Sequence, residues 1–172
     1  IKNSEANTLI SQKPFAEGMY RFSMFMISYY SRVSEQLKLD YDSFIIIQTV
    51  VSSVLYQLQK KTKSKSYSEL EKEWANSVIE TINNTTLKNN NKLTISSICL
   101  VTGLPKETVR RKVHNLCEKN ILRISKKEGV LLGSQYKKIF ENFVPQTVFE
   151  VSKLLKEWER TGVLKNLLSF KM

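Results

Sequence analysis

Four charged residues close together in the sequence have side chains suited to reading the bases of a nucleic acid: Lys106, Glu107, Arg110 and Arg111. Arginine and lysine donate hydrogen bonds to guanine N7 and O6, and glutamate accepts one from the amino group of cytosine. Each such contact is worth about 1–3 kcal/mol of discrimination between bases. The four residues fall in the N-terminal half of an expected helix, which is the half that reaches base edges when a helix enters a DNA groove.

The residues before this cluster predict a short helix and a tight turn. Thr94 suits an N-cap, and Ile95, Ile98 and Cys99 then fall on one helix face. Gly103 allows the sharp turn that follows, because glycine adopts a positive φ without a steric penalty.

A second helix is predicted over residues 105–119. Pro105 has a fixed φ that suits the first helical position. Val109, Val113 and Leu116 repeat at i, i+4 and i+7, so they form the inner face. The outer face is more basic than folding alone requires.

Two short β-prone runs follow and predict a hairpin over residues 121–132. The loop between them contains Lys126 and Lys127 and ends near Gly129. We expect both lysines to lie beside a phosphate backbone, with Arg123 flanking them. Two helices joined by a tight turn and followed by a basic hairpin predict a winged helix-turn-helix.

This segment also resembles a known family. Gly103 to Val109, together with Arg111, Leu116 and Asn120, is similar to the DNA-binding segment of catabolite activator protein-type regulators. The same winged module is similar to that of the MarR family of small dimeric regulators. The resemblance covers about forty of the 172 residues and departs at Pro105, where the first family favours a hydroxyl cap. The cyclic-nucleotide-binding β-barrel of that family is absent.

The resemblance implies a role for individual residues. It implies that Lys106, Glu107 and Arg111 read base edges in double-stranded DNA. It also implies contacts to phosphates, which it places at three hydroxyl residues: Thr94, Ser96 and Thr108.

The net charge of +11 lies on one side of the chain. Residues 1–59 contain five Lys/Arg and five Asp/Glu, whereas residues 60–172 contain 22 and 11 and hold the whole excess. Such a distribution is expected of a polyanion binder. Lysine is also abundant in chains from AT-rich genomes, so arginine is the better tracer. Three of the six arginines lie in the motif, namely Arg110, Arg111 and Arg123.

The cysteine and histidine content argues against metal and hydrolytic chemistry. Cys99 and Cys117 form neither a disulfide framework nor a metal-binding spacing, and His114 is the single histidine. We therefore expect no enzyme, no cofactor and no metal. Cys99 is expected to be a small core residue, and a redox-sensing Cys117 is a minor alternative. A reduced cytoplasmic location, associated with the nucleoid, fits this composition.

No membrane segment is expected. No signal peptide is visible, and the uncharged residues 43–59 are too short and too polar for a span.

The chain is expected to be mostly helical with one small β-hairpin, in three parts. Residues 1–62 predict an N-terminal helical lobe for dimerisation or ligand sensing. Residues 67–133 predict the winged helix-turn-helix domain, and residues 134–172 predict C-terminal helices for packing or dimerisation.

The first helix, from Pro14 to about Leu37, has apolar residues at alternating spacings of four and three, as on a helix that packs along another helix. These residues are the predicted dimer interface, with intramolecular core and a ligand-facing wall as alternatives: Phe15, Met19, Phe22, Met26, Tyr29 and Val33.

Further helices are expected on both sides of the motif. One begins at Asp40 or Asp42 and runs to about Lys60; because it is apolar nearly all round, it is expected at the centre of the N-terminal lobe or of a dimer. Another, over residues 69–87, would be the first helix of the winged domain. After the hairpin, a helix that includes Phe143 should end or kink at Pro145. A second segment then stops at Gly162, and a last short helix follows.

The function expected from the sequence is sequence-specific recognition of duplex DNA by a homodimeric transcription regulator. The helix 105–119 would enter the major groove, and the wing 121–132 would lie on the backbone or the minor groove. Pairing has a physical motive, because two copies read two half-sites. Two alternatives remain: a regulator with a small-molecule site between its N-terminal helices, and a winged helix that docks on protein.

Overall fold

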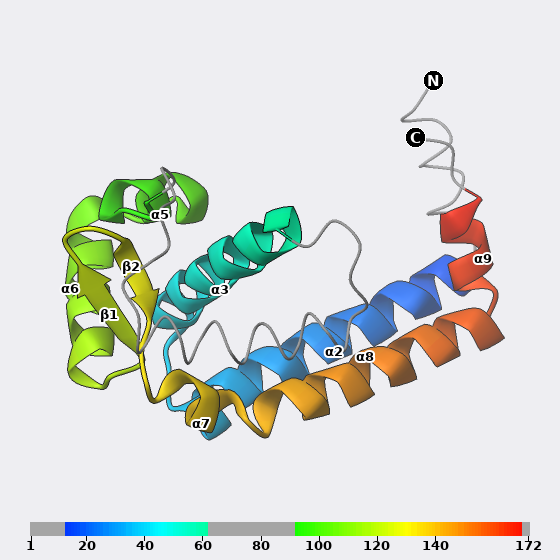
Figure 1. The fold of residues 1–172 in the computed structure, drawn as a ribbon. Helices are drawn as coiled ribbons and strands as arrows, with labels where there is room; N and C mark the ends of the chain where they lie inside the picture. Colours follow the sequence, from blue (N-terminus) through cyan, green and yellow to red (C-terminus); the bar gives the residue numbers. More distant parts are fainter. Residues whose placement is uncertain (1–12, 62–91, 170–172) are drawn as a thin grey trace. The chain divides into compact units, whose positions relative to one another are not determined.

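The computed structural model describes residues 13–61 and 92–169 of the chain. This part is mostly helical and contains one two-stranded antiparallel sheet, so the coarse expectation of helices plus a small hairpin is confirmed (Figure 1). The predicted helix over residues 69–87 lies outside the described residues.

The chain forms two compact units. The middle unit comprises Leu39–Ile139, and the split unit combines Ile1–Lys38 with Phe140–Met172. Helix α7 (Tyr136–Phe140) ends at the boundary between them. This division differs from the predicted boundaries at 62, 67 and 133, because contacts between distant segments decide it.

The middle unit starts with α3 (Tyr41–Lys61), which was expected in the N-terminal lobe and belongs instead with the motif. Asp40 starts it by accepting a hydrogen bond from the backbone N of Ser43 at 2.9 Å. The helix packs against α5, α6 and β2. Its buried side chains are those of Ser43, Phe44, Ile46, Ile47, Thr49, Val50 and Val51.

Helix α5 (Ile95–Thr102) is bounded as the sequence predicts. The Thr94 side chain accepts a hydrogen bond from Ser97 N at 3.1 Å. Gly103 has φ +72° and donates its N–H to the carbonyl of Cys99 at 2.9 Å. The left-handed glycine therefore reverses the chain between α5 and the next helix.

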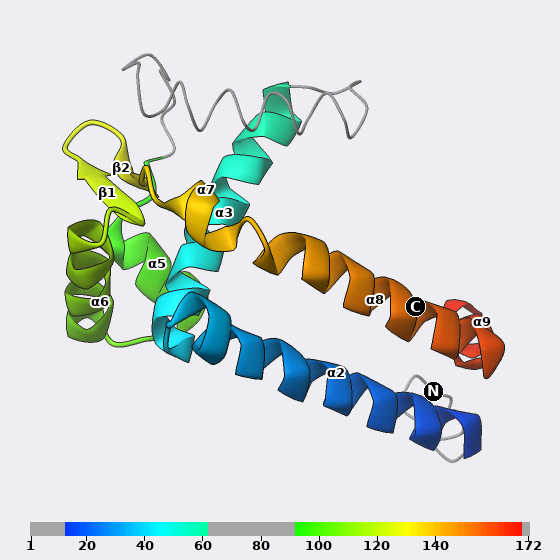
Figure 2. The same ribbon diagram turned by 90° about the horizontal axis from the view of Figure 1, so that it is seen from below.

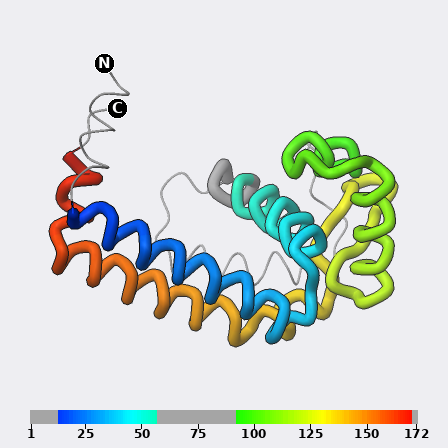
Figure 3. The backbone as a smooth tube through the Cα atoms, turned by 180° about the vertical axis from the view of Figure 1, so that it is seen from behind, coloured from blue at the N-terminus to red at the C-terminus, as the bar shows by residue number. Residues whose placement is uncertain are grey.

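Helix α6 (Lys106–Glu118), drawn in yellow-green in Figure 3, packs through the predicted inner face. Val109, Val113 and Leu116 are buried. Pro105 lies at the N-cap rather than at the first helical position, and its extended ψ of 142° feeds the chain into the helix. The difference is one residue, as is common at helix ends.

The hairpin consists of β1 (Leu122–Ser125) and β2 (Gly129–Leu132), with Leu122 opposite Leu132. It is attached to the segment before α5, because Val130 N donates to the carbonyl of Leu93 at 2.8 Å. Gly129 has φ +89°, and a Cβ there would lie 2.1 Å from the Leu93 carbonyl oxygen. Only glycine fits this approach of two backbones.

The split unit contains α2 (Lys13–Leu37), α8 (Phe143–Arg160) and α9 (Val163–Leu168). Helices α2 and α8 lie side by side and antiparallel (Figures 1 and 2). At one end, Trp158 Nε1 donates to the Gly18 carbonyl at 3.0 Å, and Val163 fills the space beside Gly18. Towards the other end, the rings of Tyr29 and Phe143 are 5.4 Å apart.

Arg32 is a buried cation between the two helices. Its Nη2 lies 2.9 Å from Glu150 Oε2, and its Nη1 lies 3.3 Å from Thr147 Oγ1. The guanidinium also stands 4.9 Å from the centre of the Phe143 ring. Because a buried charge needs a partner, this cluster fixes the register of α2 against α8.

Pro145 does not end a helix, contrary to the prediction. The break falls earlier, at Glu141 and Asn142, and Phe143 opens α8 rather than closing α7. Pro145 lies in the first turn of α8, where a backbone N–H has no partner within the helix. A proline is therefore tolerated at this position.

Candidate nucleic-acid interface

The outer face of α6 carries the predicted base-reading residues together. Lys106, Glu107, Arg110 and Arg111 are all exposed, on the side of the helix away from its buried stripe. Arg110 Nη1 lies 3.4 Å from Glu107 Oε2, with both side chains mostly exposed. So exposed an ion pair contributes little to stability, and its two members remain accessible to a ligand.

Lys112 is set apart from this basic face. It is half-buried, and its Nζ donates to Asp40 Oδ2 at 2.7 Å. Partial burial raises the pKa of the Asp40 carboxyl, but the hydrogen bonds from Lys112 and Ser43 outweigh it and leave the pKa below its ordinary value. Lys112 thus joins α6 to the start of α3.

The three hydroxyl residues expected at phosphates differ in accessibility. Ser96 is exposed in the first turn of α5. Thr94 is half-buried, and its hydroxyl caps α5 and lies 2.9 Å from Ser97 Oγ. Thr108 is half-buried in the first turn of α6. All three lie near helix N-termini, where backbone N–H groups favour an anion.

The loop of the hairpin presents Lys126 and Lys127 to solvent. The Ser125 hydroxyl shapes the loop by accepting hydrogen bonds from the backbone N of Lys127 at 3.3 Å and of Glu128 at 3.2 Å. Lys92 Nζ donates to the carbonyl of Lys126. Arg123, on β1, is half-buried and presents less of its side chain than the loop lysines do.

Four exposed lysines of the same unit were missing from the predicted site. Lys92 precedes α5, Lys119 follows α6, and Lys137 and Lys138 lie on α7. Residues 92–139 contain eleven Lys/Arg and three Asp/Glu, a net +8. Counting charge beyond the end of the hairpin would have found the pair on α7.

The two cysteines and the histidine lie in or beside the same helices. Burial raises the pKa of the Cys117 thiol, which disfavours the reactive thiolate and the redox-sensor alternative. His114 is exposed on α6, with Nδ1 3.4 Å from Glu118 Oε1. Among the described residues, no group of three or more His, Cys, Asp or Glu is placed to hold a metal ion.

The six residues predicted for a dimer interface all lie on α2, but they fall into two groups with different surroundings. Tyr29 packs on Phe143 and Phe22 lies 6.2 Å from Trp158, so both contact α8 of the same chain. Val33 is buried. The remaining three are half-buried: Phe15, Met19 and Met26.

Comparison with known proteins gives no relative: no family model, no curated protein and no solved structure matches this chain. Within the described ranges, none of the helices combines the length and apolar character needed to cross a bilayer.

Proposed function

We propose that the middle unit is a winged helix-turn-helix and that the chain is a sequence-specific, duplex-DNA-binding transcription regulator that acts as a homodimer. Helix α6 enters the major groove, and the β1–β2 hairpin lies on the backbone or in the minor groove. One observation carries the proposal: the exposed face of α6 gathers Lys106, Glu107, Arg110 and Arg111 after a glycine turn.

The dimensions support this docking. The 13 residues of α6 span about 20 Å at 1.5 Å per residue, and the major groove, about 12 Å wide, accepts an α-helix. Burial of Val109, Val113 and Leu116 holds the opposite face rigidly. The proposal includes the likeness of this segment to catabolite activator protein-type and MarR-type regulators, and the absence of enzymatic activity.

The phosphate contacts belong to the groups around α6. The proposed backbone-binding residues are Thr94, Ser96, Thr108, Arg123, Lys126 and Lys127. Ser96, Lys126 and Lys127 are the accessible ones in the free protein. These contacts fix position and orientation on the duplex, whereas the α6 residues select the sequence.

Two substitutions test this division of roles. A preferred duplex is first selected from a random pool, and its affinity is then compared with that of a scrambled duplex. Arg111→Ala should cost about 1–3 kcal/mol on the preferred duplex and relax the preference, because a base contact is lost. Lys127→Ala should weaken binding to both duplexes alike, because phosphates carry no sequence information.

Lys165→Ala, in the split unit, is the matched control and should leave both affinities unchanged. Equal losses on preferred and scrambled DNA for both Arg111→Ala and Lys127→Ala would contradict the assignment. Absence of duplex binding even at low salt would exclude the regulator itself.

A protein-docking winged helix is the second candidate. Leu100 on α5 is 87% exposed and Val101 is 69% exposed, and Ile124 on β1 is also exposed. Exposed apolar side chains next to each other, such as Leu100 and Val101, are a feature of protein contacts. This candidate predicts that Leu100→Ser abolishes binding to a partner and leaves affinity for DNA unchanged.

A further inference from the structure

The split unit exposes apolar side chains along one side of its helix pair. Val144, Val148, Val151 and Leu155 lie on α8 at i, i+4, i+7 and i+11, and each is between 36% and 61% exposed. This spacing is that of a helix stripe that packs along other helices.

A matching stripe lies on α2. Phe143, Thr147 and Glu150 of α8 contact α2, and Val144, Val148 and Val151 each follow one of them by one position. Leu155 continues this stripe four residues after Val151. On α2, Gly18 and Tyr29 contact α8, and the residues that follow them by one position are Met19 and Tyr30. Successive side chains of an α-helix are rotated by about 100° about the helix axis, so each stripe lies to one side of the row that contacts the other helix.

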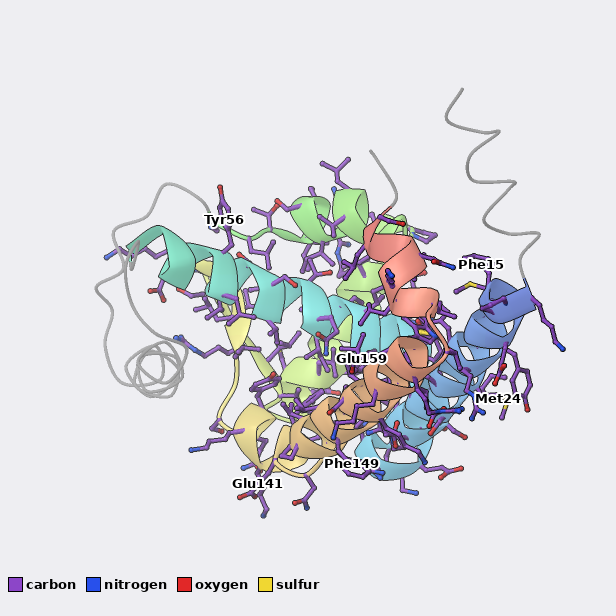
Figure 4. The ribbon with its side chains drawn as sticks, turned by 90° about the vertical axis from the view of Figure 1, so that its right-hand side faces the viewer. Phe15, Met24, Tyr56, Glu141, Phe149 and Glu159 are labelled. Atoms are coloured by element: carbon purple, nitrogen blue, oxygen red, sulfur yellow. The ribbon has the colours of Figure 1, made fainter. Side chains whose placement is uncertain are left out.

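Because α2 and α8 are antiparallel, the two stripes lie on the same side of the pair. We call them together the apolar face, which consists of Met19, Met26, Tyr30, Val144, Val148, Val151 and Leu155. The opposite side carries charged residues that include Glu17, Glu35 and Lys153, together with the exposed Phe149. Figure 4 shows Phe15, at the margin of the apolar face, and Phe149 on different sides of the helix pair.

The charge pattern favours a second protein surface over a polyanion or a lipid surface. Residues 22–31 of α2 contain no charged side chain. Residues 13–38 and 140–169 together have eight Lys/Arg and six Asp/Glu, a net +2. Binding to anionic lipid requires a basic border, which this face lacks. The seven residues of the face are all uncharged, so two copies can bury it against each other without burying a charge of the face itself.

The size of the face also fits a second copy. With about 150–250 Å² for a fully exposed large side chain, the apolar face and its margin at Phe22 and Ile27 expose on the order of 700 Å². Each partner of a stable complex contributes about 800 Å². Single proteins rarely leave a continuous apolar patch above about 600 Å² uncovered.

We propose that the apolar face is the homodimer interface, and that two copies bring α2 and α8 together as a four-helix bundle. Tyr29, predicted for the interface from the sequence, packs on Phe143 of the same chain instead, and Val33 is buried. The α8 stripe takes their place. The inference rests on the proposed function only in that a homodimer is what two DNA half-sites require.

Sedimentation velocity of the full chain at micromolar concentration tests the proposal. The wild type should sediment as a dimer. Val148→Glu and Tyr30→Glu should each give a monomer, because a charge on either helix would be buried against the second copy. Phe149→Glu is the matched control: it puts the same charge on a more exposed apolar residue of the charged side, and should remain a dimer.

A monomeric wild type would overturn the proposal, because the face would then be covered by something other than a second copy. A Val148→Glu or Tyr30→Glu dimer would also overturn it, provided that circular dichroism shows native helix content. DNA binding is measured separately. If the expected oligomeric states are found and no variant binds duplex DNA, the interface stands and the proposed function fails. If the wild type is a monomer and binds duplex DNA, the proposed interface fails and DNA binding stands.

Discussion

Two glycines of the middle unit have a positive φ for different reasons. Gly103 ends α5 in open space, since nothing lies within 4 Å of where its Cβ would be. Gly129 is enclosed, because its Cβ would meet the Leu93 carbonyl oxygen at 2.1 Å. The first position requires only a left-handed backbone, whereas the second also requires the absence of a side chain.

Gly129→Ala should therefore destabilise the chain more than Gly103→Ala. We expect Gly103→Ala to cost about 1 kcal/mol, the strain of a left-handed alanine. Gly129→Ala should cost about 3 kcal/mol, because the segment before α5 must move away from β2. Urea denaturation followed by circular dichroism measures both. Equal costs would mean that the bridge between Leu93 and the hairpin contributes nothing to the fold.

At the scale of elements, the junction of α3 and α6 depends on one carboxylate. Asp40 caps α3 through Ser43 and accepts a hydrogen bond from Lys112 of α6. Its pKa in the folded chain lies below the ordinary value. The unfolded chain therefore binds a proton first as the pH falls. The stabilisation by Asp40 is complete above pH of about 4 and is lost as the pH falls through the depressed pKa.

Asp40→Asn should reduce stability at neutral pH by less than about 1 kcal/mol, because Asp40 is mostly exposed and asparagine still caps a helix. The difference from the wild type should vanish in acid, where the wild-type carboxyl is protonated. Urea denaturation at a series of pH values measures it. In a double-mutant cycle with Lys112→Gln, a coupling free energy that does not change with pH would refute this role.

Local chemistry explains which elements the sequence predicts. Thr94, Gly103 and the stripe of Val109, Val113 and Leu116 act within a few residues of each other, so the limits of α5 and α6 follow from them. The place of α3 depends on partners far along the chain, and an apolar helix does not identify its partners. Pro145 was misread because a proline is equally compatible with the end of one helix and the first turn of another.

The candidate site was predictable to a similar degree. The exposed residues of α6 follow from the helix period, since the apolar stripe fixes which side faces solvent. Tyr29 and Val33 were assigned to a dimer interface because a helix that pairs within its own chain has the same spacing as one that pairs with another copy. Only the position of α8 distinguishes the two cases.

For the whole molecule, the excess positive charge and the apolar face lie on different units. The described residues of the middle unit from 92 to 139 carry a net +8, whereas those of the split unit carry +2 and the apolar face. This distribution supports a division of labour in which one unit binds a polyanion and the other binds a second copy.

The salt dependence of DNA binding should therefore originate in the middle unit. The logarithm of affinity should fall linearly with the logarithm of salt concentration, by about 0.9 per phosphate contacted. Lys126→Gln in the hairpin loop should make this slope shallower by about one, because it removes a phosphate contact. Lys153→Gln on α8 should leave it unchanged. Fluorescence anisotropy over a range of salt concentrations gives both slopes, and equal effects would show that the two units share the contact.

The order of the two units along the chain has a consequence for synthesis. The split unit is interrupted by the whole of Leu39–Ile139, so α2 leaves the ribosome long before its partner α8 exists. At about 10 residues per second this delay is roughly ten seconds, enough time for the middle unit to fold first. During that interval Gly18 and Tyr29 have no α8 to pack against, and Arg32 has no carboxylate from Glu150. The nascent α2 thus exposes these groups until α8 is made, and the middle unit is complete before two chains can pair through the apolar face.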